Sequence, residues 1–170
     1  MALNLHLAAY QTDLAHNLGS MIRLSACFGV TLDIIGPCGF PLSEKSLKEA
    51  SLDYGEKCEM ILHSDWSNFK KTSTNRRLIL LSTKAKKNLW DFDFNLNDTL
   101  IVGRETQGVT DEVYGQCDAS VTIPMPGGGR SLNVAISAGI AISEAIRLSL
   151  IHISEPTRLL SISYAVFCLK

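Results

Sequence analysis

Short apolar runs alternate with longer segments of helical periodicity along most of this chain of 170 residues. Leucine and β-branched residues dominate the runs, as is typical of strands buried in a parallel sheet. The predicted strands cover residues 3–9, 30–36, 60–62, 78–81, 100–102 and 119–123. The segments between them predict helices over 17–27, 43–50, 65–71 and 133–147, and a short helix capped by Thr110. Because strands and helices take turns, we expect an α/β fold with a mainly parallel sheet flanked by helices.

The composition excludes several classes of protein. Hydrophobic residues make up 46% of the chain and charged residues 19%, which is too apolar for a disordered chain. A net charge of −1 excludes a uniformly basic nucleic-acid coat, so any RNA contact must come from a local patch. The longest apolar stretch, residues 134–153, contains Glu144 and Arg147, which argues against a membrane span. With no basic-then-apolar leader, we expect a cytoplasmic protein.

The cysteines give no sign of a metal site or a disulfide framework. There is no C-x-x-C pair, and no histidine lies at metal-ligand spacing. We expect reduced thiols that behave as small buried side chains, and no bound metal. The five cysteines are Cys27, Cys38, Cys58, Cys117 and Cys168.

The last residues differ in character from the rest of the chain. Pro156 would break a helix arriving from the preceding segment. The pieces LSLIHISEPTR and ISYAVFCLK resemble a translated sequencing adapter with an index between its two parts. We therefore expect residues 1–147 to form the domain and residues 148–170 to be a non-native tail; a genuine C-terminal strand or tail is the alternative.

Three loops that follow strands hold the candidate functional residues, because ligands bind at the carboxyl ends of strands in open α/β sheets. The first contains Asn17-Leu18-Gly19 and leads to Arg23. We expect Asn17 to cap a helix and Arg23 to point back to the mouth of the loop. A plain cap with a surface arginine is the alternative interpretation.

The second loop, GRETQG at residues 103–108, places Glu105 between two glycines that let main-chain groups face a ligand. It matches neither the dinucleotide-binding pattern nor the phosphate-binding P-loop, which argues against a nucleotide-dependent oxidoreductase. The third loop, IPMPGGGRSLN at residues 123–133, delivers Ser131 and Asn133 to the start of the last helix. The alternative for this loop is a flexible surface segment.

Together, the three loops resemble the motifs of the SPOUT RNA ribose methyltransferases. The motifs have the order and spacing of that family. They are N-x-G-x-x-x-R at 17–23, GRETQG at 103–108, and IPM at 123–125 with RSLN at 130–133. The resemblance covers residues 3–147 and is closest to the small members that act on the tRNA wobble nucleotide, supported by IIGPCGF, ASLDY and LSTK. Arg104, Gln107 and the glycines at 127–129 depart from those members.

The resemblance implies a C-terminal trefoil knot, a homodimer, and S-adenosyl-L-methionine (SAM) as the methyl donor. It implies methylation of the ribose 2′-hydroxyl of the wobble cytidine or uridine in a tRNA anticodon loop. Carried over by position, cofactor contacts fall on Leu81, Gly103, Glu105, Ile123, Met125, Ser131 and Leu132.

The catalytic residues that the resemblance implies are Arg23, Asn17, Asn133 and Ser131. Because a guanidinium stays protonated, Arg23 suits anchoring a phosphate and polarising the hydroxyl rather than accepting a proton. Two alternatives stay open: a ribose methyltransferase for another tRNA site or rRNA, and a knotted RNA-binding protein without catalysis.

RNA contacts are less well marked. The one concentration of basic residues suits either a phosphate-tracking patch or a solvated face; it comprises Lys70, Lys71, Arg76, Arg77, Lys84, Lys86 and Lys87. Further candidates for RNA contact are the aromatic residues Tyr54, Trp66 and Trp90. We expect His6, His16 and His63 to be structural or surface residues, and contact of His16 with RNA is the alternative.

Overall fold

The computed structural model describes residues 4–95 and 97–148 of the chain. Its centre is a seven-stranded sheet with the strand order β3-β2-β1-β6-β4-β7-β5, and every neighbouring pair is parallel. This confirms the predicted parallel α/β sheet. The strands are β1 His6–Tyr10, β2 Thr31–Ile35, β3 Met60–His63, β4 Arg77–Leu81, β5 Lys87–Asn88, β6 Asp98–Val102 and β7 Ala119–Thr122.

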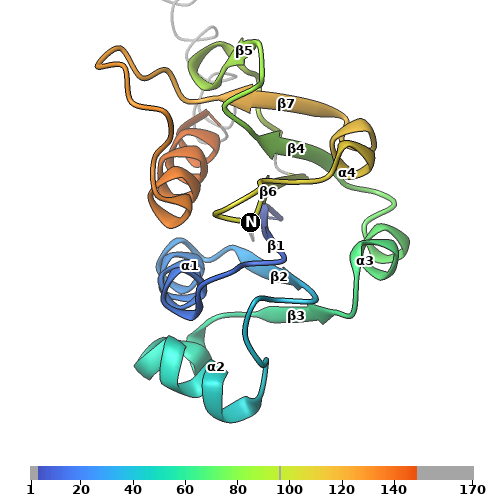
Figure 1. Cartoon of the computed structure of the whole chain (residues 1–170), viewed down its shortest axis with the longest axis vertical. Coiled ribbons are helices and arrows are strands. Elements are labelled where there is room, and N and C mark those ends of the chain that lie inside the picture. Colours follow the sequence, from blue (N-terminus) through green and yellow to red (C-terminus); the bar gives the residue numbers. More distant parts are fainter. Residues whose placement is uncertain (1–3, 96, 149–170) are drawn as a thin grey trace, which may run out of the picture.

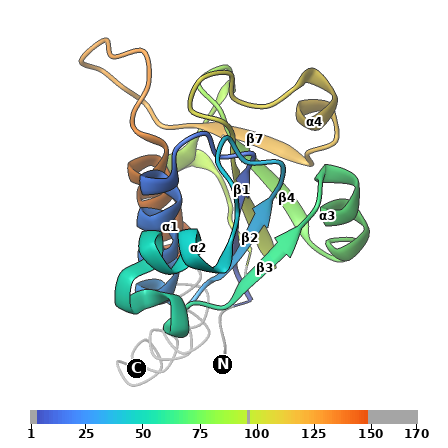
Figure 2. The ribbon, with the colours of Figure 1, turned by 60° about the horizontal axis from the view of Figure 1, so that its bottom comes forward.

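Helices cover both faces of the sheet. Figure 1 shows α1, α2 and the last helix on one side and α3 and α4 on the other, and Figure 2 shows the same layers after a rotation. The helices are α1 Ala15–Phe28, α2 Glu44–Ser51, α3 Trp66–Thr72, α4 Asp111–Gly115, and a last helix whose described part covers residues 134–148; two 3-10 turns are η1 Leu52–Lys57 and η2 Leu89–Asp91.

Burial on both faces explains why the strands are continuous apolar runs rather than alternating ones. All five residues of β1 are buried. Leu7 and Ala9 belong to the core beneath α1 and the last helix, whereas Ala8 and Tyr10 belong to the smaller core beneath α3 and α4. Successive side chains of a strand point to opposite faces, so each strand supplies both cores.

The helix ends confirm the predicted cap at Thr110 and correct one other prediction. Thr110 accepts a hydrogen bond from the N–H of Val113, and Ser43 accepts one from the N–H of Ser46, so both act as caps. Gly29 ends α1 in the left-handed conformation with φ 65°. The prediction that Asn17 caps its helix is wrong, because α1 begins at Ala15 and Asn17 lies within its first turn.

Several short elements escaped the sequence analysis. β5 has two exposed residues, and η1 and η2 have no hydrophobic repeat long enough to mark them. The first strand covers His6–Tyr10, whereas the prediction was residues 3–9; residue 3 lies outside the described part.

The segment expected to be a non-native tail also lies outside the described residues, apart from Leu148, which packs against the larger core. No helix within the described ranges is long and apolar enough to cross a membrane.

The described cysteines are all free thiols. Burial raises the pKa of Cys58 and of Cys117 to about 11, which keeps both protonated at neutral pH. Cys27 is exposed, so the expectation of uniformly buried thiols is wrong for this position. Cys168 lies beyond the described residues.

Candidate functional site

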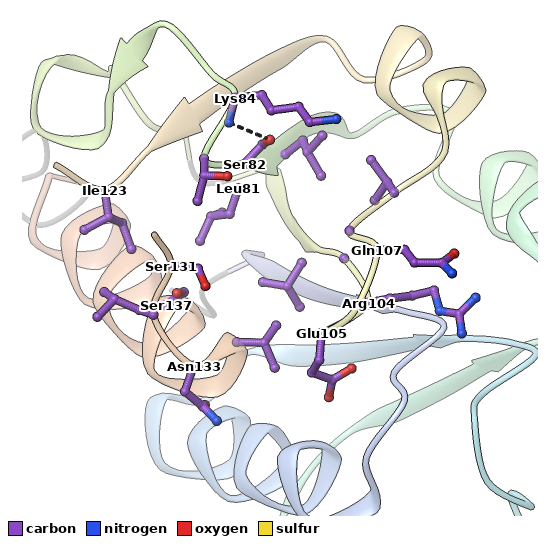
Figure 3. A pocket seen from close by; sticks show the side chains of 18 of the residues that line it. Leu81, Ser82, Lys84, Arg104, Glu105, Gln107, Ile123, Ser131, Asn133 and Ser137 are labelled. Atoms are coloured by element: carbon purple, nitrogen blue, oxygen red, sulfur yellow. Dashed lines mark hydrogen bonds between the residues drawn. The ribbon is translucent and has the colours of Figure 1, made fainter. Parts of the chain in front are cut away.

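A cavity of about 740 Å³ opens where β4, β6 and β7 end (Figure 3). Its walls are the loops that follow these strands, the start of α1 and the start of the last helix. This volume is within the range of small-molecule sites. The lining includes Asn17, Leu81, Gly103, Glu105, Ile123, Met125, Ser131, Leu132 and Asn133. The structure therefore brings residues from all three predicted loops to one cavity.

A directional chain of hydrogen bonds joins the three loops beside this cavity. The Nδ2 amide of Asn17 donates to Glu105 Oε1 over 2.8 Å, and Asn17 Oδ1 accepts from Asn133 Nδ2 over 3.0 Å. Asn133 Oδ1 in turn accepts from the N–H groups of Ala135 and Ile136 at the start of the last helix. The carboxylate accepts at one end and the helix N–H groups donate at the other, so both amides have a defined orientation.

These hydrogen bonds explain why Asn17 does not cap α1. Its side chain is only 3% exposed, and both of its polar atoms are bonded to residues that are distant in sequence. A buried amide needs such partners, because each unsatisfied group would cost about 1–3 kcal/mol. The tertiary bonds therefore replace the local cap.

The loop after β6 closes tightly on itself. Arg104 and Gly108 exchange two backbone hydrogen bonds of 2.9 Å, and Gly108 has φ 69°. A Cβ atom added to Gly103 would lie 2.6 Å from the backbone carbon of Gly108. Position 103 thus requires glycine for a close approach of two backbone segments, which a sequence pattern cannot distinguish from approach to a ligand.

Asp13, which belongs to none of the predicted motifs, anchors the same loop. Its carboxylate accepts hydrogen bonds from the Arg104 guanidinium, at 2.7 and 3.0 Å, and from the hydroxyl of Thr106, at 2.7 Å. The bonds from Arg104 and then from Thr106 hold the pKa of Asp13 below its ordinary value. Arg104 is therefore held by an internal ion pair, which explains why Figure 3 shows its side chain turned away from Ser131.

Arg23 does not line the cavity. Its side chain is exposed on α1, and its guanidinium lies 4.6 Å from the centroid of the Tyr54 ring in η1. The spacing from Asn17 advances the helix by about 9 Å and turns it by about 240°, so the two side chains leave different faces. The expectation that Arg23 points back to the mouth of its own loop is wrong for the single chain.

The loop that follows β4 also forms part of the rim of the cavity. In Figure 3, the N–H of Lys84 donates to Ser82 Oγ over 3.2 Å beside Leu81. His16 and Arg130 also line the cavity, and both are exposed. Figure 2 shows that the segment between β7 and the last helix extends away from the sheet as an open loop.

Among the described residues, no group of three or more His, Cys, Asp or Glu side chains is placed to hold a metal.

The predicted basic concentration is divided by the fold. Arg76 pairs with the buried Asp33, and Arg77 pairs with the buried Asp98, each over 2.7 Å. Lys71, Lys84, Lys86 and Lys87 remain exposed, and none of the four forms an ion pair within residues 4–95 and 97–148. Within this group, the two arginines thus stabilise the fold, and the lysines are left to face an anionic partner.

The three aromatic candidates also differ in their surroundings. Trp66 is buried and donates its indole N–H to Gln116, so it has no face to offer a base. Trp90 is 51% exposed, and the ring of Tyr54 contacts the Arg23 guanidinium. Both His6 and His63 are buried and bonded to Asp33, which confirms the prediction that they are structural or surface residues.

Comparison with known proteins adds three findings. A model of the SpoU rRNA Methylase family matches residues 4–143. A tRNA (cytidine(34)-2′-O)-methyltransferase of Beijerinckia indica is 43% identical over 143 residues, which cover 83% of this chain and 89% of that protein. A solved structure described as "Structural insights into the 2-OH methylation of C/U34 on tRNA" has a TM-score of 0.80 at 36% identity, covering 85% of this chain and 95% of that chain.

Some of the similar structures were solved with a ligand. The SpoU methyltransferase AviRb from Streptomyces viridochromogenes, in complex with the cofactor AdoMet, has a TM-score of 0.71 at 25% identity. The match covers 84% of this chain and 59% of that chain.

Proposed function

Because this chain belongs to the SpoU rRNA Methylase family, we propose that it transfers a methyl group from SAM to the ribose 2′-hydroxyl of nucleotide 34 of a tRNA. The proposal for position 34 follows the names of the relative from Beijerinckia indica and of the similar solved structure. The observation that carries it is the cavity at the ends of β4, β6 and β7, where the three motif loops meet. The nucleotide is the wobble cytidine or uridine.

The residues of the cavity fit SAM. Leu81 and Ile123 offer apolar walls, and Glu105 offers a carboxylate to a cationic ligand. Gly103 and Ile123 lie just past the ends of β6 and β7, where their main-chain groups can face a ligand. Met125, Ser131 and Leu132 would contact the molecule from the third loop. When bound, SAM supplies an electrophilic methyl group on a sulfonium.

The chain's own residues would supply alignment and charge. Holding two reactants at near-attack distance contributes as much as roughly 7–11 kcal/mol to catalysis. Arg23 would bind the phosphate next to the reacting ribose and polarise its hydroxyl, since a guanidinium remains protonated. Ser131 would hydrogen-bond the ribose from the third loop. Asn17 would act through Glu105 and Asn133, because both of its polar atoms are already bonded to them.

We propose that Arg23 reaches the reaction from the partner subunit of a homodimer. In its own chain it lies over Tyr54, outside the cavity. Three large apolar side chains are exposed at the cavity rim and at the adjoining helix starts, where a second copy would cover them: Leu14 at 45%, Leu132 at 41% and Ile136 at 57%. The family also supports the proposal that the segment following β7 forms a trefoil knot.

The second candidate function is the same reaction on another RNA. The description of the matching family names rRNA, so a ribosomal substrate or a different tRNA position is the nearest alternative. The reaction chemistry and the cavity would be the same, and only the methylated nucleotide would differ. Mass spectrometry of nuclease digests locates that nucleotide.

The test incubates the full chain with labelled SAM and either tRNA or rRNA. We expect one 2′-O-methylated nucleotide at tRNA position 34. Arg23→Ala should abolish transfer while SAM binding is kept. Lys57→Ala, which removes another cation over the same Tyr54 ring, is the matched control and should leave transfer unchanged. Methylation elsewhere would refute the assignment to position 34, and undiminished transfer by Arg23→Ala would refute the role of Arg23.

A further inference from the structure

One residue outside the predicted motifs, Asp13, holds three consecutive residues of the second loop through its side chain and its backbone N–H. The Asp13 carboxylate accepts from Arg104 through one oxygen, and from the N–H and the hydroxyl of Thr106 through the other. The backbone N–H of Asp13 donates to Glu105 Oε2 over 2.7 Å. Both oxygens of Glu105 are thus fixed, one by Asp13 and one by Asn17.

We propose that Asp13 is a positioning residue for the methyl donor. It sets the conformation of residues 103–106 and so places Gly103 and Glu105 in the wall of the cavity. Asp13 does not line the cavity itself, so it acts through the loop and not by contact with the ligand. This inference rests on the proposed function, because it assigns the loop to SAM binding.

The backbone around Asp13 is itself tightly held. Gln11 adopts φ 46°, a left-handed conformation that is uncommon for a residue with a side chain. Its N–H donates to the carbonyl of Ile35, and the carbonyl of Thr12 accepts from the N–H of Gly39. A Cβ atom at Gly39 would lie 2.8 Å from the carbonyl oxygen of Asp13. The loop after β1 is therefore wedged against the loop after β2 and forms a firm support.

The charges fit a positioning role. Asp13 and Glu105 are two carboxylates joined to the same short segment, and Arg104 pairs with Asp13 at 33% exposure of its own side chain. Arg104 neutralises Asp13, which does not line the cavity, so Glu105 is the carboxylate of this pair that faces the cavity. An arginine in the second motif therefore contributes here to the geometry of the loop.

The test measures SAM binding by calorimetry with the full chain and its Asp13→Asn variant. The amide has the size of the carboxylate but only one acceptor oxygen, so it must turn an NH₂ group toward either Arg104 or Thr106. We expect SAM affinity to fall about tenfold. The KM for SAM should rise in proportion, while kcat at saturating SAM stays within about twofold, because the reacting groups are unchanged.

Two controls separate positioning from folding. Asp65→Asn changes a carboxylate that caps α3 with the same kind of backbone hydrogen bond, and it should leave SAM affinity unchanged. A fraction of protein that has unfolded irreversibly would lower the binding stoichiometry at the same Kd, and reversible unfolding, which raises the apparent Kd, is measured separately by urea titration of the variant without SAM. Thr106→Val removes only the hydroxyl bond to Asp13 and should weaken SAM binding about threefold, whereas Thr106→Ser should keep wild-type affinity.

The outcomes are distinct. If the wild-type chain does not bind SAM, the proposed function fails together with the inference. If the wild type binds SAM and both Asp13→Asn and Thr106→Val bind it equally well, only the positioning role of Asp13 is refuted. If Asp13→Asn does not fold, the comparison of Thr106→Val with Thr106→Ser decides.

Discussion

Asn17 donates its side-chain amide to the Glu105 carboxylate over 2.8 Å, across 88 positions of sequence. The same amide accepts from Asn133, so one buried side chain touches the second and the third motif loop. Hydrogen bonds to a carboxylate are stronger than those between neutral groups, and burial strengthens them further. The relative placement of the three loops therefore depends on this residue.

The series of hydrogen bonds from Glu105 through Asn17 and Asn133 to the last helix has a fixed order of donors and acceptors, and this order predicts the effect of Asn133→Asp. The carboxylate would still cap the helix, because it accepts from Ala135 and Ile136, but it has no N–H to give Asn17. Turning the Asn17 amide over would set its oxygen against Glu105. We expect the free energy of unfolding in urea to fall by about 1–3 kcal/mol.

The control for this change is the reverse exchange at another helix cap. Asp65 caps α3 through one oxygen, and its other oxygen accepts from the Ser64 hydroxyl, which can accept instead of donate once an amide replaces the carboxylate. Since Asn and Asp cap helices about equally well, Asp65→Asn should change stability by less than about 0.5 kcal/mol. An Asn133→Asp protein as stable as wild type would show that the amide chain is not needed.

The close approach of Gly103 to Gly108 predicts a cost for any side chain at position 103. Gly103→Ala places a methyl group 2.6 Å from a backbone carbon that cannot rotate away. We expect a loss of about 1–3 kcal/mol in the free energy of unfolding, and weaker SAM binding because the loop must open. Gly115→Ala, in α4, meets nothing within 4 Å and should be neutral or stabilising. Equal stabilities of the two variants in urea titrations would contradict the prediction.

Complementation tests whether Arg23 serves the partner's cavity. Arg23→Ala and Glu105→Gln should each be inactive as pure proteins, because each lacks a part of every site. In a mixed dimer, a shared arrangement leaves one cavity with both residues intact. If subunits reassort at random, the mixture should recover about a quarter of the wild-type rate of tRNA methylation. A mixture that stays inactive after confirmed exchange of subunits would place Arg23 and Glu105 of one chain in the same site.

Asp33 makes stability depend on acid pH. It is fully buried, and it accepts from His6 at 2.8 Å and from His63 and Arg76 at 2.7 Å each. Burial alone would raise the pKa of Asp33, but these hydrogen bonds outweigh it and lower the pKa from 3.8 to about 2. A lowered pKa stabilises the fold above the unfolded value, so this contribution is lost as pH falls from about 4 to about 2.

We expect the loss to be roughly 2 kcal/mol. The measurement is the free energy of unfolding of wild type and Asp33→Asn at several pH values; the difference between the two should shrink over this range. Because the group is buried, 1 M salt should change the result little. A constant difference between pH 5 and pH 2 would mean that Asp33 titrates at an ordinary pKa.

The lysines and the arginines of the basic segment should respond differently to neutralisation. Lys84 lines the cavity, and Lys86 and Lys87 follow it on the exposed surface. Changing all three to Gln should lower tRNA affinity and reduce the salt slope by about 0.7 for each phosphate that these lysines neutralise in the wild type. Arg77→Gln should instead destabilise the fold, because it leaves the buried Asp98 unpaired. Filter binding at several salt concentrations distinguishes the two effects.

The sequence alone predicted the parallel α/β sheet and the place of the three loops. Hydrophobic runs and helix caps such as Thr110 and Gly29 depend on residues a few positions apart, so they can be recognised locally. The carboxyl ends of parallel strands lie at one edge of the sheet. For this reason, the meeting of the three loops at one cavity was predictable as well.

Only the tertiary structure decided which side chains face one another. The hydrogen bonds that shape the site and the core join residues that are distant in sequence. Asn17 and Glu105 are 88 residues apart, Asp13 and Arg104 are 91 apart, and Arg76 and Asp33 are 43 apart. No local pattern marks such pairs, because they depend on strand order and on the angle at which each loop leaves the sheet. The direction of Arg23 could not be predicted for the same reason: a helix start displaced by two residues, and a stacking partner in η1, turn its side chain away from the cavity.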